Sequence, residues 1–267
     1  MDLESNTVLK VFNSEEIVYS VKVFDNKYVL IGSSQASISI YDIESGILIS
    51  ELEGHSQSVL VIKILSDNII ASGSSDKLIK IWSFESKLCL KTLAGHLAAV
   101  RCFTSVNNNL LVSGSSDKTI KLWNLSRGKC VQTFIGHSSS VIVVEIFSKE
   151  KLISGSADGF IKIWDLLGNC IHTFSKSSHC IRSIFVFSSD KILFSTDSGD
   201  INLWCLVDNH IIKTFNGHKQ SSLIQKLSNE TFISCSIDKT IRSWDLVTGF
   251  SKVLFSNSFP IVTFELI

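Results

Sequence analysis

Tryptophan recurs along this chain of 267 residues at nearly constant intervals. The five tryptophans are separated by 41, 41, 40 and 40 residues, and Tyr41 stands 41 residues before the first of them, Trp82. In four of these units a Gly-His pair, a Ser and an Asp precede the Trp, the Ser by ten residues and the Asp by six. Such a period indicates a repeat architecture, in which each small unit buries its apolar face only against its neighbours.

Apolar and polar residues alternate inside each unit. The segments 79–82 and 120–123 have the two-residue period of a half-buried strand, and segments such as 140–144 and 130–134 are rich in the β-branched residues that strands favour. Turn-forming clusters such as 115–118 separate them. The sequence therefore predicts an all-β chain with four short strands in every unit of about 41 residues.

The order Gly-His, Ser-Gly-Ser-x-Asp and Ile-Lys-hydrophobic-Trp resembles the WD-repeat β-propellers, and the resemblance covers nearly the whole chain. The segment from Gly95 to Asn124 is a close match. The closing Trp-Asp dipeptide of that family is present at Trp164 and Trp244 but is replaced elsewhere, for example by Trp204-Cys205. The resemblance implies a propeller of four-stranded antiparallel blades.

Counting strands predicts a single β-propeller domain over residues 1–267 with six complete blades, from about residue 17 to 255. The tails 7–12 and 260–266 read as extra strands, and we predict that they form a rudimentary seventh blade. Two arrangements stay open at this point. Either six blades close the ring and the tails add strands to it, or the ring keeps seven-fold curvature and leaves a gap that invites a partner or a dimer.

Ser, His and Asp are also the constituents of a hydrolase triad, but a nucleophilic site is needed once and this set occurs four times. The resemblance instead implies a hydrogen-bonded relay inside each blade, which pairs buried groups that would each cost about 1–3 kcal/mol if left unpaired. We therefore expect no catalytic residue. The relays implied are His55, Ser72, Asp76 and Trp82; His96, Ser113, Asp117 and Trp123; His137, Ser154, Asp158 and Trp164; and His218, Ser234, Asp238 and Trp244.

Two units depart from this set. In the fifth, Ser177 stands in place of the His and Ser198 in place of the Asp. In the first, the four places are taken by Ser14, Ile31, Gln35 and Tyr41. We predict that blades one and five are the least stable of the six.

Seven cysteines occur, but no C-x-x-C pair, so we expect neither a metal site nor a cofactor. Three of the cysteines share one place in the repeat, on the fourth strand, and are predicted to be small buried hydrophobes; they are Cys89, Cys130 and Cys170. The histidines outside the Gly-His places are predicted to lie on the surface; they are His172, His179 and His210.

The balance of charges limits the kinds of molecule that the chain is expected to bind. Twenty-five basic residues cancel twenty-five acidic ones, so the chain lacks the basic surface of a nucleic-acid binder. No apolar run approaches the roughly 18 residues of a spanning helix, and the N-terminus has no secretory signal pattern. These observations predict no membrane insertion and an intracellular location, cytoplasmic or nuclear. The partners expected are other proteins, and the oligomeric state stays open.

In propellers of this family one position of each first strand points toward the mouth of the central channel. By this resemblance that position holds Tyr19, Leu60, Arg101, Ile142, Arg182 and Leu223. The resemblance is closest to the propellers of ubiquitin-ligase substrate receptors, whose arginines there read phosphorylated segments, and guanidinium suits phosphate. The candidate partner-binding residues are Arg101, Arg182, Leu60, Ile142, Ser75 and Ser116.

The function predicted is a non-catalytic scaffold that docks peptides or loops of partner proteins on the propeller face. The alternative is a substrate-recognition propeller of a ubiquitin ligase that reads phosphorylated segments and depends on another domain or protein to dock the ligase. Dependence of binding on phosphate distinguishes the two.

Overall fold

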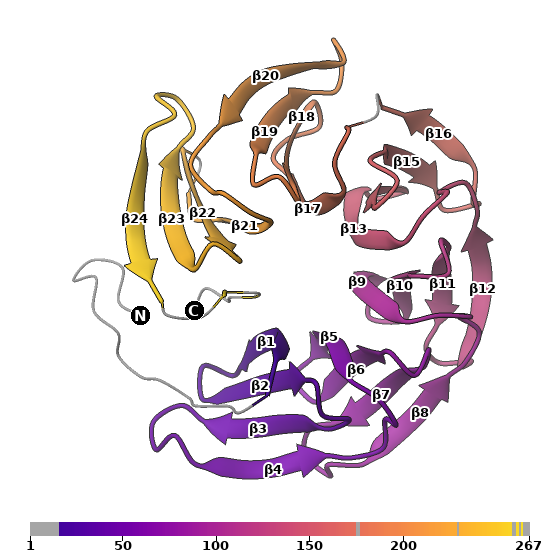
Figure 1. The fold of residues 1–267 in the computed structure, drawn as a ribbon. Coiled ribbons are helices and arrows are strands. Elements are labelled where there is room, and N and C mark those ends of the chain that lie inside the picture. Colours follow the sequence, from indigo (N-terminus) through magenta and orange to yellow (C-terminus); the bar gives the residue numbers. More distant parts are fainter. Residues whose placement is uncertain (1–15, 175–176, 229, 258–259, 262, 264–267) are drawn as a thin grey trace.

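A computed structural model describes residues 16–174, 177–228, 230–257, 260, 261 and 263. The described residues form six four-stranded antiparallel sheets, numbered here as blades 1 to 6 in chain order and arranged around a central axis (Figure 1). The strands are β1 (Val18–Phe24), β2 (Tyr28–Ser33), β3 (Ile38–Asp42) and β4 (Leu48–Leu52) in blade 1; β5 (Val59–Ser66), β6 (Ile69–Ser74), β7 (Ile79–Ser83) and β8 (Cys89–Leu93) in blade 2; β9 (Val100–Asn107), β10 (Leu110–Ser115), β11 (Ile120–Asn124) and β12 (Lys129–Phe134) in blade 3; β13 (Val141–Ser148), β14 (Lys151–Ser156), β15 (Ile161–Asp165) and β16 (Cys170–Thr173) in blade 4; β17 (Ile181–Val186), β18 (Lys191–Thr196), β19 (Ile201–Cys205) and β20 (His210–Phe215) in blade 5; and β21 (Ser222–Lys226), β22 (Thr231–Ser236), β23 (Thr240–Asp245) and β24 (Ser251–Ser256) in blade 6.

The prediction of six blades with four antiparallel strands each is confirmed. The first strand of each blade lies next to the axis and the fourth on the outside (Figure 1). The second strands are almost completely buried, because neighbouring blades cover both of their faces. Each fourth strand is the exposed outer edge of its sheet.

The predicted burial of three cysteines on the fourth strands is wrong. Cys89, Cys130 and Cys170 are all exposed. The fourth strand has no neighbour on its outer side, and in β8 and β12 the fully buried position is the last residue, Leu93 or Phe134. Each cysteine lies at or near the opposite end of its strand, beside the hairpin turn. The exposure of these cysteines is therefore decided by their position on an edge strand and not by the apolar character of the thiol.

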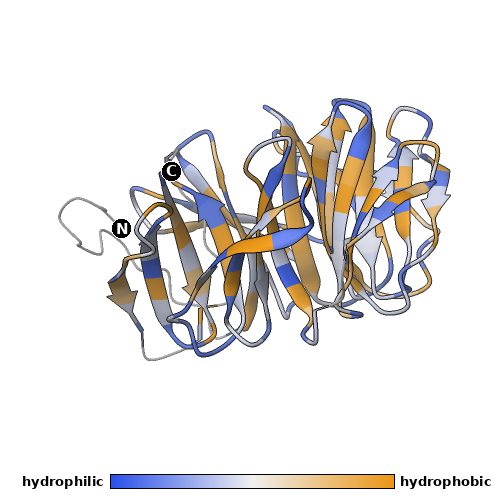
Figure 2. Cartoon of the chain, turned by 90° about the horizontal axis from the view of Figure 1, so that it is seen from above, coloured by the Kyte–Doolittle hydropathy of each residue, from blue (hydrophilic) through white to orange (hydrophobic). Residues whose placement is uncertain are grey.

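The hydrophobic core is divided into layers between consecutive blades. Ile38 and Leu52 of blade 1 pack against Val59 and Trp82 of blade 2, and the same kind of contact recurs between later blades. The side view in Figure 2 shows hydrophobic segments along the strands throughout the ring. Every blade thus depends on its neighbours for burial of its apolar face, as expected for a stacked repeat.

Small residues let neighbouring blades approach one another. Gly155 lies in the second strand of blade 4, and a Cβ atom added there would lie 2.4 Å from Cγ2 of Ile181 in blade 5. The corresponding residue of blade 5, Ser195, meets Ser222 instead and donates a hydrogen bond to its carbonyl oxygen at 2.5 Å. A glycine on the second strand therefore lies opposite a large residue of the next blade, whereas a serine there lies opposite another serine.

The described part of the ring is not closed by a seventh sheet. Figure 1 shows β21–β24 and β1–β4 at the two ends of the arc, with no described strand between them. The predicted extra strand at 7–12 lies outside the described residues, and so does most of 260–266. Of that second tail, the Ile261 amide donates a hydrogen bond to the Ser236 carbonyl oxygen at 3.2 Å. The rudimentary seventh blade stays a prediction.

Candidate protein-interaction surface

Four side chains meet inside blade 2. The indole N–H of Trp82 donates to the Ser72 hydroxyl at 2.8 Å, and that hydroxyl lies 2.7 Å from Nε2 of His55. The other ring nitrogen of His55, Nδ1, lies 2.7 Å from a carboxylate oxygen of Asp76. Because an ionised carboxylate only accepts, a neutral His55 carries its proton on Nδ1 and accepts at Nε2 from the Ser72 hydroxyl. All four groups are then paired.

Blade 3 repeats this geometry. The indole N–H of Trp123 donates to the hydroxyl of Ser113 at 2.8 Å, and Nε2 of His96 lies 2.7 Å from the same hydroxyl. Nδ1 of His96 lies 2.8 Å from a carboxylate oxygen of Asp117. Both Ser113 and Trp123 are buried, at 0% and 1% exposure, so their hydrogen bonds replace bonds to water that neither group can form in the folded chain.

Blades 4 and 6 contain the same relay. In blade 6 the indole N–H of Trp244 donates to the hydroxyl of Ser234 at 2.7 Å, and that hydroxyl lies 2.6 Å from Nε2 of His218. Nδ1 of His218 lies 2.8 Å from Asp238. In blade 4 the corresponding distances are 2.8, 2.8 and 2.9 Å, and the residues are His137, Ser154, Asp158 and Trp164. The structure thus brings together all four sets that the sequence singled out.

Burial decides the charge states of these relays. Burial lowers the pKa of His96, although the nearby Asp117 carboxylate acts to raise it. Burial lowers the pKa of the other three relay histidines in the same way. Burial by itself would raise the pKa of Asp117, but hydrogen bonds from Thr119, the Leu97 amide and His96 outweigh it and lower the pKa to about 2. The histidines are therefore neutral and the aspartates ionised at neutral pH.

The relay aspartates also fix the loops at one end of each blade. Asp76 accepts from the Ser56 amide at 3.0 Å, in the loop before β5, and from the Leu78 amide at 2.9 Å, in the turn between β6 and β7. In an antiparallel sheet of this order, the loop before the first strand and the turn between the second and third lie at the same end. These loops form one face of the ring, here called the relay face, and the relays hold it in shape.

Blade 5 lacks the relay. Phe194 takes the place of the serine, and the indole nitrogen of Trp204 is buried with no hydrogen-bond partner. Ser177 and Phe194 help to line a cavity of about 440 Å³ beside Trp204. In blade 1, Ile31 is buried and Tyr41 pairs with Val29 across the strands, and Ser14 lies outside the described residues. The surface histidines predicted at 172, 179 and 210 are exposed.

The mouth of the channel is built from the first strands. A cavity of about 660 Å³ occupies the axis, and all six positions predicted by the family resemblance lie along its wall, from Tyr19 in blade 1 to Leu223 in blade 6. Leu60, Ile142 and Arg182 are half-buried there, whereas Arg101 is exposed. Ser116 accepts a hydrogen bond from Nε of Arg101 at 2.8 Å, and Ser75 occupies the equivalent turn of blade 2.

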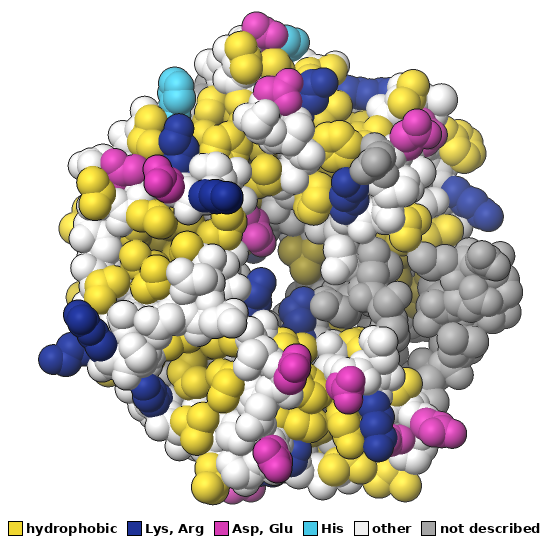
Figure 3. Space-filling view, turned by 180° about the vertical axis from the view of Figure 1, so that it is seen from behind, with side chains coloured by type: hydrophobic (Ala, Val, Ile, Leu, Met, Phe, Trp, Pro, Cys, Tyr) yellow, Lys and Arg dark blue, Asp and Glu magenta, His cyan; other side chains and the backbone are white. Residues whose placement is uncertain are grey.

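A second group of charges lies deeper in the channel. Lys22, Lys63 and Glu145 come three residues after Tyr19, Leu60 and Ile142 and line the same cavity. Burial raises the pKa of Glu145, although the positive charges of Lys63 and Lys22 act in the opposite direction. Figure 3 shows the central hollow from the side opposite to Figure 1, with basic and acidic side chains at its edge.

Sequence reasoning stopped at the channel mouth and missed these three residues. Their signal was available, because charged residues interrupt otherwise apolar first strands at positions 22, 63 and 145. The structure places these charges along the channel wall, where Glu145 also accepts a hydrogen bond from the Thr104 hydroxyl of blade 3 at 3.4 Å. The channel therefore combines an apolar and basic mouth with a charged interior.

Comparison with known proteins agrees with this architecture. The family described as "WD domain, G-beta repeat" matches residues 46–83, 87–124, 128–165 and 209–245, more than half of the chain. Each matched segment ends on the residue after the Trp of a complete relay. No protein with a curated description matches the sequence, and no helix among the described residues is long and apolar enough to cross a membrane.

Proteins with these repeats generally bind other proteins and act as interaction domains without catalysis. The six four-stranded blades, the four relays and the matched segments support one assignment. The chain belongs to the WD-repeat family of β-propellers.

Proposed function

We propose that this protein is a non-catalytic scaffold that binds peptides or loops of partner proteins at the mouth of its channel, on the relay face. The observation that carries the proposal is the cavity of about 660 Å³ with Tyr19, Leu60, Ile142 and Leu223 on its wall. Apolar side chains around an opening of this size suit a partner's side chain or loop. The relays fix the surrounding loops, so little conformational entropy is lost on binding.

A peptide library tests this proposal. Binding of the library to the wild-type chain is compared with binding to a double variant, Leu60→Gln with Ile142→Gln, which makes the mouth polar. The matched control is Leu88→Gln, because Leu88 is exposed in the hairpin turn between β7 and β8, at the opposite end of its blade. We expect enriched peptides to lose at least tenfold in affinity for the double variant only. Peptides that bind both variants as well as wild type contradict the proposal.

A second candidate function is the reading of phosphorylated segments, and the two arginines favour it. Arg101 and Arg182 line the same cavity, and neither forms an ion pair with an acidic side chain among the described residues. The Nε atom of Arg182 is buried without a hydrogen-bond partner. A phosphate group supplies acceptors for both guanidinium groups.

Phosphatase treatment separates the two functions. If the arginines read phosphate, captured phosphopeptides are released by phosphatase, and both Arg101→Ala and Arg182→Ala weaken their binding. The control is Arg127→Ala, since Arg127 is exposed in the β11–β12 hairpin turn at the other end of its blade. Binding that is indifferent to phosphatase and to both arginine variants rejects this candidate and leaves the scaffold proposal standing.

A further inference from the structure

The residue after the Trp, or after Tyr41 in blade 1, has one role in five of the six blades. There, an oxygen atom of that residue accepts a hydrogen bond from a backbone amide in the turn between the third and fourth strands. In blade 4, Oδ1 of Asp165 accepts from Leu167 at 3.0 Å, and in blade 6, Oδ1 of Asp245 accepts from Thr248 at 2.6 Å. The other three acceptors are Asp42, Ser83 and Asn124.

Blade 5 has a thiol at this place. Cys205 is 7% exposed, and its Sγ lies 3.4 Å from Oδ2 of Asp208, so a group that accepts in the other blades is a donor here. The turn passes through Asn209, whose φ of 53° is left-handed and returns the chain into β20 at His210. The turn thereby places a carboxylate and an imidazole next to the thiol.

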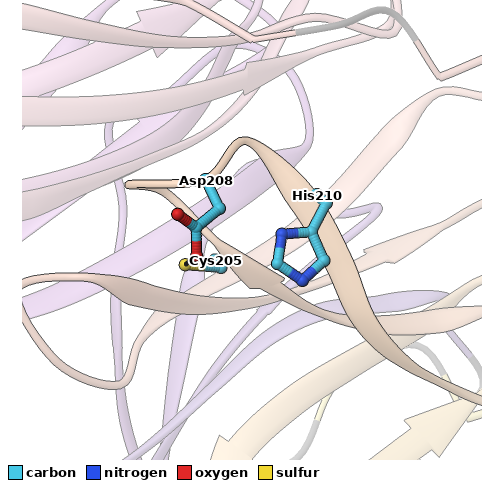
Figure 4. Close-up of side chains that lie close together, drawn as sticks. All are labelled: Cys205, Asp208 and His210. Carbon is cyan, nitrogen blue, oxygen red and sulfur yellow. Dashed lines mark hydrogen bonds between the residues drawn. The ribbon is translucent and has the colours of Figure 1, made fainter.

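Sγ of Cys205, a carboxylate oxygen of Asp208 and a ring nitrogen of His210 all lie within 4.8 Å of one another (Figure 4). This is the one group of three such side chains among the residues that the structure describes. Thiolate, imidazole and carboxylate are the three ligand types that zinc takes in proteins, and zinc bond lengths place tetrahedral ligand atoms roughly 3.3–3.7 Å apart. The thiol-to-carboxylate distance of 3.4 Å already lies in that range.

We propose that Cys205, Asp208 and His210 bind a divalent transition-metal ion, with zinc best suited to the donor set. Binding forms bonds from the ion to the thiolate sulfur, the imidazole nitrogen and the carboxylate oxygen, and the thiol proton passes to solvent. Three protein ligands leave a fourth position open to water or to a donor from a partner. Asp208 and His210 are exposed, so the ion enters from solvent.

The absence of C-x-x-C spacing hid this group from the sequence argument. Its ligands follow the pattern Cys-x-x-Asp-x-His, in which only one residue is a cysteine. The position within the fold supports a stabilising role. Blade 5 has lost its relay, and a metal that joins the end of β19 to the start of β20 would tie together its two outer strands.

The experiment titrates the full chain, purified free of metal and under reducing conditions, with Zn²⁺ and with Co²⁺, whose absorption spectrum reports a thiolate ligand. We expect one ion per chain, a sulfur-to-cobalt charge-transfer band and a higher melting temperature on addition of Zn²⁺. The test variant is Cys205→Asn, whose amide oxygen is the turn acceptor found at Asn124 in blade 3, so the turn can form while no carboxylate replaces the thiolate. It should lose the charge-transfer band and at least about 100-fold in affinity, more than loss of an outer-shell contact costs.

Two further variants make the result specific. His210→Gln removes one ligand without touching the turn acceptor and should weaken binding by a similar factor. Cys170→Ser removes an exposed thiol from the neighbouring blade and should leave affinity and spectrum unchanged. The proposal is overturned if no saturable binding occurs, if cobalt binds without a sulfur band, or if Cys170→Ser weakens binding as much as Cys205→Asn.

Discussion

The indole nitrogen distinguishes otherwise similar tryptophans. Trp164 and Trp204 are both buried, at 1% and 5% exposure, and each packs against an aromatic ring of its own layer, Phe134 and Phe174. Only Trp164 donates a hydrogen bond, to Ser154 at 2.8 Å. On folding, the indole nitrogen of Trp204 loses its hydrogen bond to water and gains no partner. This loss lowers the free energy of unfolding.

This difference predicts unequal effects of the same substitution. Trp164→Phe and Trp204→Phe remove similar apolar area, but Trp164→Phe also breaks a buried hydrogen bond and leaves the relay incomplete. We expect Trp164→Phe to lower the free energy of unfolding by about 1–3 kcal/mol more than Trp204→Phe does. Urea unfolding of the two variants measures the difference. Equal losses would show that the relay bond contributes nothing at this position.

Sequence reasoning identified residues whose surroundings are the same in several blades. It failed at residues whose surroundings differ from one blade to the next. The relay residues were identified because four copies share one offset, whereas the positions around the channel mouth were identified by the resemblance to WD-repeat propellers. Burial of Cys89 could not be inferred from its apolar character, since exposure on an edge strand is a tertiary property. The contact between Cys205 and Asp208 depends on a turn whose backbone follows Asn209, and no repeat position signals it.

At the scale of the blade, contact between second and first strands limits side-chain size. The second-strand glycines of blades 2, 3 and 4 face Val100, Val141 and Ile181 of the next blade. In blade 5 the second strand carries Ser195, and the first strand of blade 6 begins with Ser222. The spacing between blades is thus maintained by pairs of residues rather than by glycine alone.

Gly155→Ala is expected to destabilise the protein by about 1–3 kcal/mol through overpacking against Ile181. The penalty should shrink in an Ile181→Ala background, because the atom that lies 2.4 Å from the added Cβ is then absent. A double-mutant cycle on unfolding free energies measures this coupling, for which we expect at least about 0.5 kcal/mol. Additive effects of the two substitutions would locate the strain somewhere other than this contact.

The blades are also expected to differ in local stability. Blades 1 and 5 lack the relay, and each relay supplies three buried hydrogen bonds that join two strands and a loop. Amide hydrogen exchange measured blade by blade should therefore be faster in the second and third strands of blades 1 and 5 than in those of blades 2, 3 and 4. Slower exchange in blades 1 and 5 would refute the stabilising role of the relays.

Across the whole molecule, the four relays make stability depend on pH. Burial holds the pKa of each relay histidine below its ordinary value of 6.5. Below pH 6.5 the unfolded chain binds protons that the folded chain does not, so the free energy of unfolding falls as pH falls. Each histidine contributes at most about 1.4 kcal/mol per pH unit.

The relay aspartates add a second, more acidic window. Their pKa values lie below the ordinary value of 3.8, at about 2 for Asp117 and Asp238. The stability that they contribute is present above pH 3.8 and is lost as pH falls toward 2. On acidification from pH 7 the unfolding free energy is therefore expected to decline below pH 6.5 and to decline again below pH 4.

Urea titrations between pH 8 and pH 5 test the histidine window. His96→Gln lowers stability at every pH but should make the slope shallower, because one of four buried neutral histidines is gone. His172→Gln, at an exposed histidine outside the relays, is the matched control, and a change of slope is assigned to the relay only if it exceeds the change in this variant. A slope that His96→Gln does not alter would mean that His96 binds protons equally well in the folded and the unfolded chain, and a decline on acidification that the variant makes steeper would mean that His96 is protonated in the folded ring. If His96 is protonated in the folded ring, ion pairs between the relay histidines and aspartates hold the relay face. The affinity of that face for its partners would then depend on salt concentration.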